Sequence, residues 1–302
     1  MRVDISFLSA VKNEEQHVTQ MISSILDDAD SSGVSAEILF CDDHSDDETL
    51  SVLNRVAEQD GRVRIVDTPD TSGKNACYNA AFMQSRGKLI AFLAGDDTIP
   101  KGSLKPRVSD FTTPDTKGLT VSFAKLKTFS DDPKYDAMLI PRGKGVSKSG
   151  AALTMTRGLA EHIFPLPLEL PNEDTWVSFL AEHLADQVLL RDRVVANYRI
   201  HSGNSHKRDV SFEQHNEFLT PRAEVWRLIS ESHSEIFPPE ATLEAQRRWE
   251  LERLRRKGDI WRIFTYRHSS LPERLALLSH TKPLFYYLRS SLERYVAGRG
   301  QR

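Results

Sequence analysis

The chain has 302 residues, of which 39% are hydrophobic and 27% charged, with 15 Gly, 14 Pro and two Cys. This average composition excludes a disordered, collagen-like or disulfide-stapled protein, and no apolar run reaches the roughly 18–20 residues that span a bilayer. The net charge of −3 hides an asymmetry, because residues 247–302 carry 14 Lys and Arg against five Asp and Glu, a net +9. The remaining residues are acidic, so the two parts suit different partners.

Over the first hundred residues, short apolar runs typical of buried strands alternate with apolar residues three or four apart, which is typical of helices. Strands are expected at 5–11, 37–41, 63–66 and 89–94, and helices at 18–26, 50–57 and 76–84. This alternation predicts an α/β fold, a mostly parallel sheet with helices on both faces and strand 89–94 at its centre. Ligands bind such sheets outside the carboxyl ends of the strands, here residues 10–14, 41–45 and 95–97.

The rest of the chain divides at about residue 210. Before it, strands are expected at 119–123, 138–140, 151–155, 188–190 and 194–199, with a helix at 174–184. After it, helices are expected at 212–232, 239–257, 259–267, 272–280 and 283–297, separated by prolines and Gly258. We therefore expect three parts, namely 1–105, 106–210 and a basic helical extension over 211–302.

Asp96 and Asp97 directly follow the apolar strand 89–94, so their carboxylates are expected at the edge of the sheet. Adjacent carboxylates repel each other unless a cation binds there. A few hard oxygen ligands suit Mg²⁺ or Mn²⁺ shared with a diphosphate. The alternative interpretation is a solvated turn or a helix cap.

Asp42 and Asp43 follow the second expected strand in the same way. A carboxylate there can accept a hydrogen bond from a base or a ribose hydroxyl. The alternative is a cap, because Ser45 or Asp46 precedes a helix with acids in its first turn. Both roles are compatible, with Asp43 functional and Ser45 or Asp46 capping.

Three segments are distinctive in their order, their spacing and the expected strands beside them. They are Ile5–Leu8 leading to Asn13-Glu14-Glu15, then Phe40–Thr49, and then Gly73, Asn79 and Gly87 leading into Leu89–Asp97. Together they resemble the family 2 glycosyltransferases, which have the GT-A fold, a Rossmann-like sheet covered by helices. The resemblance extends more weakly through Asn172-Glu173-Asp174 and Tyr198–Ser205, and so covers about residues 3–206.

The resemblance implies a nucleotide-diphospho-sugar donor, most often a UDP-sugar, and an inverting transfer. Asp96 matches the family's ribose- or sugar-facing acid. Asp97 matches its ligand for Mn²⁺ or Mg²⁺, a Lewis acid that neutralises the departing diphosphate. The residues that would hold the base and ribose are Ala10, Val11, Asn13, Glu14 and Asp43.

Two positions depart from the family pattern. The first acid of the usual D-x-D-D stretch is Ala94, and the frequent A-R-N reads Cys77-Tyr78-Asn79, which removes a phosphate-facing arginine. Asn79 keeps its place among the donor-facing residues. Lys74, one helical turn earlier, either replaces the arginine's charge without its bidentate fork or is an ordinary surface lysine.

An inverting transfer needs a group that takes the proton from the acceptor hydroxyl. Glu173 and Asp174 precede an amphipathic helix and read as a capping region, where the helix dipole favours acids. They also match the family's E-D pair, and this resemblance makes Asp174 the general base with Glu173 beside it. His201 lies where family members carry a histidine facing the diphosphate or the metal, and imidazole suits Mn²⁺ better than Mg²⁺. The alternative is a polar loop residue.

The basic tail has two interpretations. Its helices pack on the catalytic part or on a second subunit, giving a homo-oligomer, or residues 259–302 lie on an anionic membrane surface. Lipid-linked acceptors are common for such enzymes, which favours the membrane, and no nucleic-acid-binding module is recognised. Gln246–Trp249 is one residue short of the Q-x-x-R-W signature of processive enzymes, so single-sugar addition is expected.

Charged residues interrupt the N-terminal apolar run, so no signal peptide is expected, and Cys41 and Cys77 look unpaired, which fits a reducing compartment. We expect a cytoplasmic enzyme, peripheral on the inner face of the cell membrane, acting on a glycan or lipid-linked acceptor. One alternative is a non-catalytic GT-A-like binding or scaffold protein, favoured by Ala94 and Tyr78. The other is a sugar nucleotidyltransferase, which releases diphosphate.

Overall fold

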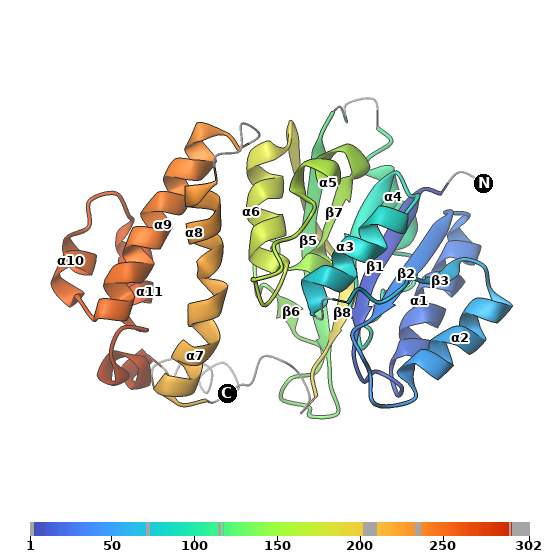
Figure 1. Ribbon diagram of the computed structural model, residues 1–302, viewed down its shortest axis with the longest axis horizontal. Helices are drawn as coiled ribbons and strands as arrows, with labels where there is room; N and C mark the ends of the chain where they lie inside the picture. Colours follow the sequence, from blue (N-terminus) through green and yellow to red (C-terminus); the bar gives the residue numbers. More distant parts are fainter. Residues whose placement is uncertain are drawn as a thin grey trace. The chain divides into compact units, whose positions relative to one another are not determined.

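The structure is a computed structural model that describes residues 3–70, 73–113, 116, 118–201, 210–232, 237–289 and 291. The chain forms two compact units, Met1–Asn204 and Ser205–Arg302 (Figure 1). The parts expected over 1–105 and 106–210 share one sheet within the first unit.

The described residues of the first unit form an eight-stranded sheet in the order β3-β2-β1-β4-β7-β5-β6, with β8 also paired to β5. The strands are β1 (Ile5–Val11), β2 (Ala36–Asp42), β3 (Val63–Ile65), β4 (Leu89–Phe92), β5 (Thr120–Phe129), β6 (Leu139–Ile140), β7 (Leu153–Thr156) and β8 (Gln187–Arg199). Pairing is parallel among β1 to β4 and between β5 and β8, and antiparallel on both sides of β7. The predicted mostly parallel sheet with a central β4 is confirmed.

Helices cover both faces of the sheet (Figure 1). On one face, Met21 and Ile25 of α1 join a core with Phe7 and Phe40 of the sheet. On the other face, the Tyr78 ring meets Phe92 edge-on, 5.0 Å between centroids. Each fully buried side chain of this kind contributes about 1.5–3 kcal/mol. The first face carries α1 (Val18–Ser32), α2 (Thr49–Gln59) and α4 (Leu104–Ser109); the second carries α3 (Lys74–Gln84), α5 (Arg157–Ile163) and α6 (Asp174–Leu184).

Some elements differ from the sequence prediction. The strands expected at 188–190 and 194–199 form one strand, β8. The polar residues between them stay in the strand because its pairing with β5 is irregular around Lys125. Two of these, Arg191 and Arg193, bond to Asp110. The helices α4 and α5 were not expected, since six or seven residues are too few to show helical periodicity.

The second unit is helical where it is described. Its helices are α7 (Phe212–Arg222), α8 (Glu224–Glu231), α9 (Pro239–Lys257), α10 (Ile260–Thr265) and α11 (Leu271–Leu278), and residues 283–289 are also helical. The single helix expected over 212–232 breaks at Ala223, just after Pro221. Positions 290 and 292–297 of the last expected helix lie outside the described residues. Among the residues that the structure describes, no helix is long and apolar enough to cross a bilayer.

Candidate active site

Four strands bring their carboxyl ends to one edge of the sheet. The strands β1, β2, β4 and β8 run in the same direction, and the antiparallel β7 begins at this edge, after the 3₁₀ turn η1 (Gly150–Ala152). Residues that follow β4 and β8 therefore lie close together, although about a hundred positions separate them in the sequence. The helix α6 begins beside η1, as the hydrogen bond described below shows.

Asp96 and Asp97, which follow β4, are both buried, 8% and 2% exposed. Asp97 Oδ1 accepts a hydrogen bond from the Arg199 N–H at 2.9 Å, and Asp96 Oδ2 lies 3.1 Å from His201 Nε2. Burial and the charge of Asp96 raise the pKa of Asp97 well above its ordinary range. The structure thus brings together the two predicted aspartates and the predicted histidine.

Lys74, at the start of α3, forms an ion pair with Glu173, 3.0 Å between Nζ and Oε2. Burial raises the pKa of Glu173, and the Lys74 ammonium opposes that rise. Burial by itself would lower the pKa of Lys74. The negative charge near by, above all that of Glu173, has the larger effect and raises this pKa well above its ordinary value. Lys74 is therefore the ion-pair partner of a buried carboxylate rather than a free surface lysine. Its contact with a donor phosphate stays a prediction.

Asp174 is the first residue of α6. Its Oδ1 accepts a hydrogen bond from the Gly150 N–H at 2.6 Å, which fixes the carboxylate against η1. A Cβ at position 150 would lie 3.0 Å from Glu173 Oε1 and 3.1 Å from Asp174 Oδ1, so glycine allows both carboxylates to approach. Within the described part of the chain, no hydrogen bond reaches Asp174 Oδ2.

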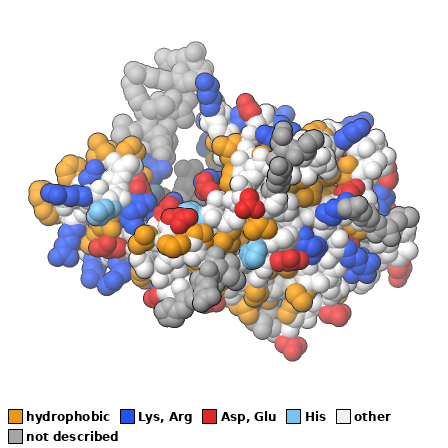
Figure 2. Space-filling view, turned by 90° about the horizontal axis from the view of Figure 1, so that it is seen from above, with side chains coloured by type: hydrophobic (Ala, Val, Ile, Leu, Met, Phe, Trp, Pro, Cys, Tyr) orange, Lys and Arg blue, Asp and Glu red, His pale blue; other side chains and the backbone are white. Residues whose placement is uncertain are grey.

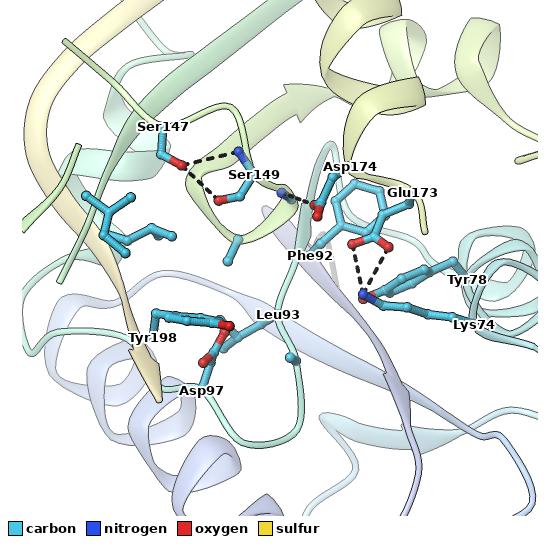
Figure 3. A pocket seen from close by; sticks show the side chains of 15 residues that line it. Lys74, Tyr78, Phe92, Leu93, Asp97, Ser147, Ser149, Glu173, Asp174 and Tyr198 are labelled. Carbon is cyan, nitrogen blue, oxygen red and sulfur yellow. Dashed lines mark hydrogen bonds and ion pairs between the residues drawn. The ribbon is translucent and has the colours of Figure 1, made fainter. Parts of the chain in front are cut away.

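Lys74, Asp97, Glu173 and Asp174 line one cavity of about 270 Å³ (Figure 3). Asp96 and His201 are not among the residues that line it. Asp97 and Asp174 face it from opposite sides, Asp97 beside Tyr198 and Asp174 beside Glu173 and Lys74. Its volume is slightly below the roughly 300–1,000 Å³ typical of small-molecule sites, and its lining combines apolar side chains with a few polar groups. The other lining residues are Tyr78, Phe92, Leu93, Ala94, Leu126, Ile140, Ser147, Ser149, Gly150 and Ala151.

The donor set at Asp97 is compatible with a divalent cation that also binds a diphosphate. Among the described residues there is no group of three or more His, Cys, Asp or Glu side chains placed to hold an ion. Mg²⁺ and similar ions are commonly held by one or two carboxylates together with substrate phosphates. A buried Asp97 whose ionised form is disfavoured by Asp96 is the kind of carboxylate that a cation stabilises. The residues present therefore fit such an ion.

The loops after β1 and before α2 are tied together by hydrogen bonds. The Asn13 N–H donates to Ser45 Oγ at 2.9 Å, and Asn13 Oδ1 accepts from the Asp46 N–H at 2.8 Å. The Glu14 N–H donates to Thr49 Oγ1 at 2.7 Å. The predicted caps Ser45 and Asp46 are therefore wrong, because these residues bind the neighbouring loop and no side chain caps α2.

Several of the residues predicted to hold the base and ribose lie at the ends of β1 and β2 or in the loops that follow them. Burial, then the charges of Asp96 and Asp47, raise the pKa of Glu14 to about 8. Asp43 Oδ1 accepts from the Gly73 N–H at 2.8 Å, which joins the end of β2 to the start of α3. Ala10 and Val11 end β1. The structure thus gathers these residues around one end of the sheet, outside the 270 Å³ cavity.

Asn79 lies away from the cavity. Its amide donates to the Leu166 carbonyl at 2.9 Å and accepts from the Leu166 N–H at 2.7 Å. Both ends of the amide therefore hold the main chain after α5, which favours a structural role over a donor contact.

The sequence did not single out several cavity residues. Ser147 and Ser149 come from the segment between β6 and η1, and their hydroxyls lie 3.0 Å apart. No local pattern marks them, because only the fold brings this segment to the cavity. Tyr198 stands in a motif that carried the family resemblance, but the motif alone did not give it a role.

The model of the family described as "Glycosyl transferase family 2" matches residues 6–145. This stretch is somewhat less than half of the chain, and over it the chain is similar to glycosyl transferase family 2. The matched region contains β1 to β4 and both strand-end aspartates after β4. The predicted resemblance is confirmed over this part of the chain.

A known relative of this region is also named as a glycosyltransferase. An uncharacterized glycosyltransferase of Haemophilus influenzae is 30% identical over 105 residues, which are 35% of this chain and 41% of that protein. The match thus spans less than half of that relative's length.

Solved structures give the same fold over nearly the whole chain. A structure of S. aureus TarS residues 1–349 in complex with UDP-GlcNAc has a TM-score of 0.57 at 18% identity, over 95% of this chain and 88% of that one. The mannosyltransferase PcManGT from Pyrobaculum calidifontis, in complex with GDP-Man and Mn²⁺, has a TM-score of 0.57 at 14% identity, over 98% of this chain and 81% of that one. At these identities the likeness establishes the GT-A fold, as predicted.

Proposed function

We propose that the chain is an inverting glycosyltransferase that moves one sugar from a nucleotide-diphospho-sugar to a hydroxyl of a glycan or lipid-linked acceptor. The observation that carries this proposal is that Asp97 and Asp174, from separate elements, line one cavity. An acid at the donor-facing strand end and a carboxylate with a free oxygen are the two groups that a single displacement needs.

The donor would bind at the carboxyl ends of β1, β2 and β4, where open α/β sheets bind nucleotides. Asp43 and the loop over residues 10–14 would contact the base and ribose, and Asp96 the ribose or sugar. The fold likeness to proteins with UDP-GlcNAc and with GDP-Man supports a nucleotide-sugar donor, and we propose a UDP-sugar.

Asp174 would act as the general base. Its Oδ1 is held by Gly150, so the carboxylate is oriented before substrate binds. Its Oδ2 would accept the proton of the acceptor hydroxyl as that oxygen attacks the anomeric carbon. The attack would come from the face opposite the nucleoside diphosphate, which leaves as its bond to the anomeric carbon breaks. One such displacement inverts the configuration. Glu173 and Lys74 would hold the start of α6 in place through their ion pair.

A divalent ion, Mn²⁺ or Mg²⁺, would be held by Asp97, with His201 near by through its contact to Asp96. When bound, it would supply Lewis-acid stabilisation of negative charge on the diphosphate. For the place of action we propose the inner face of the cell membrane, with the C-terminal unit as the attachment.

The substitution Asp174→Asn tests the mechanism. We expect transfer to fall by about 10²–10⁴-fold, since an amide cannot take the proton, while donor binding measured by calorimetry stays unchanged. Asp131→Asn, at an exposed aspartate of the same unit, is the matched control and should keep full activity.

The released product separates the alternatives. Release of a nucleoside diphosphate supports sugar transfer, whereas release of diphosphate would identify a nucleotidyltransferase. Donor binding by the wild-type chain without turnover of any acceptor would point to a binding or scaffold protein. Undiminished transfer by Asp174→Asn would refute the assigned base.

A further inference from the structure

The C-terminal unit exposes large apolar side chains on three helical segments. Trp261 on α10 is 74% exposed, Leu275 on α11 is 52% exposed, and Leu284 in the segment 283–289 is 67% exposed. Soluble proteins seldom gather so many large apolar side chains on their surface unless they bind something there. We call the set the apolar face: Ile260, Trp261, Phe264, Leu271, Leu275, Leu284 and Leu288.

Contacts within the unit bring these three segments together. Arg274 Nη1 of α11 donates to the Phe264 carbonyl of α10 at 2.5 Å. A Cβ built at Gly258 would lie 2.6 Å from Lys282 Nζ, so the start of the segment 283–289 lies beside the start of α10. The three segments that carry the apolar face are therefore neighbours within the unit.

Cations accompany the apolar face. Arg262, next to Trp261, has a side chain that is 73% exposed, and its Nε lies 3.6 Å from Asp259 Oδ2. Lys257, Arg267 and Lys282 are also exposed. Figure 2 shows hydrophobic and basic side chains side by side over the C-terminal unit, at the left of the view. Residues 247–302 as a whole carry the net +9 noted above.

We propose that the apolar face docks on an anionic lipid bilayer. Trp side chains settle at the headgroup level, Leu and Phe enter the boundary of the acyl chains, and Lys and Arg contact lipid phosphates. Each cation near an anionic surface strengthens binding roughly fivefold. The inference deepens the membrane location proposed above, and its evidence lies wholly in the C-terminal unit.

A second copy of the chain fits this surface less well. A symmetric pair would place the same patch against itself, and so would bring Arg262, Arg267 and Lys282 of one copy toward those of the other. Like charges at an interface weaken it, whereas an anionic bilayer complements them.

The test is binding of the full chain to vesicles, measured by co-sedimentation at low salt. We expect binding to phosphatidylcholine vesicles that contain phosphatidylglycerol and much weaker binding to phosphatidylcholine alone. The double substitution Trp261→Glu/Leu275→Glu should lower vesicle affinity at least about tenfold. Met83→Glu, at an apolar residue 81% exposed in the first unit, is the matched control and should bind as the wild type does.

Two further measurements keep the result independent of folding and of catalysis. Anionic vesicles should shift the tryptophan emission of the wild type to the blue, and Trp261→Phe should remove most of that shift while it still binds. Asp174→Asn should bind vesicles like the wild type, so a failure of the proposed transfer chemistry leaves this result unchanged.

The proposal is overturned if the full chain ignores anionic vesicles, or if the double variant binds as tightly as the wild type. It is also overturned if light scattering gives a wild-type dimer that the double variant converts to a monomer, since the apolar face then joins two copies.

Discussion

At the scale of single residues, the candidate site depends on how its carboxylates are paired. Glu173 is buried and would carry an uncompensated charge without Lys74, whose Nζ lies 3.0 Å away. Asp174, its neighbour, is held separately, since its Oδ1 accepts a hydrogen bond from the Gly150 N–H. The lysine that the sequence pattern offered as a phosphate ligand thus forms an ion pair with Glu173 at the start of α6.

Lys74→Met should lower the free energy of unfolding by about 1–2 kcal/mol, less than for a fully buried pair because the lysine side chain is 40% exposed. The double variant Lys74→Met/Glu173→Gln should recover most of this loss, as urea denaturation would measure.

The same two variants separate structure from binding. If Lys74 also contacts the donor phosphates, the double variant will regain stability but not donor affinity in calorimetry. Recovery of both would restrict Lys74 to its pairing with Glu173, and no loss in the single variant would contradict the pairing itself.

Residue patterns predicted the carboxylates but not their partners. Asp96 and Asp97 were predictable because two charged residues directly after a buried apolar strand must lie at the edge of the sheet. The Lys74–Glu173 pair joins positions about a hundred residues apart, and Ser147 and Ser149 reach the cavity only through the fold. A local pattern carries no information on such contacts.

At the scale of elements, close packing fixes where β4 begins. A Cβ at Gly87, just before β4, would lie 2.5 Å from the Ser6 backbone nitrogen of the adjacent β1. The Gly87 N–H also donates to Ser6 Oγ at 2.7 Å. The close approach of these two segments therefore positions β4, the strand after which Asp97 reaches the cavity.

Gly87→Ala should therefore destabilise the first unit by about 1–3 kcal/mol, because the methyl group meets backbone rather than a flexible side chain. Gly61→Ala is the matched control, since nothing lies within 4 Å of a Cβ there, and should change stability by less than about 1 kcal/mol. Chemical denaturation of both variants checks this, and an equal effect at the two sites would refute the packing argument.

Elements were predicted where periodicity was long and clear. The helices at 174–184 and 239–257 appear with the expected bounds, and β1 spans the expected 5–11. The elements that were not predicted have physical reasons. The helices α4 and α5 are too short to show a helical period of apolar residues, and the polar middle of β8 made one strand look like two.

At the scale of the whole molecule, the chain consists of two compact units with different surfaces. The first holds the cavity and its acids, and the second carries the apolar face with its cations. A ligand of the first unit acts by mass action on the unit that binds it.

A UDP-sugar with Mn²⁺ should therefore raise the unfolding temperature of one calorimetric transition and leave the other in place, with EDTA abolishing the rise. At a hundredfold excess over the dissociation constant, the expected stabilisation is about 2.7 kcal/mol. Three of the four tryptophans, Trp226, Trp249 and Trp261, lie in the second unit, so tryptophan emission should follow the unshifted transition. An equal shift of both transitions would mean that the units unfold as one.

The cavity has walls of two kinds. Asp97 and Tyr198 stand at strand ends, where a change of backbone disturbs the whole sheet, whereas Ser147 and Ser149 stand on the connection between β6 and η1. That connection belongs to no strand, although the Ser147 N–H donates to the Ala124 carbonyl of β5 at 2.7 Å. If the proposed acceptor binds in this cavity, residues 141–149 are therefore the first segment to vary in order to change which acceptor is used.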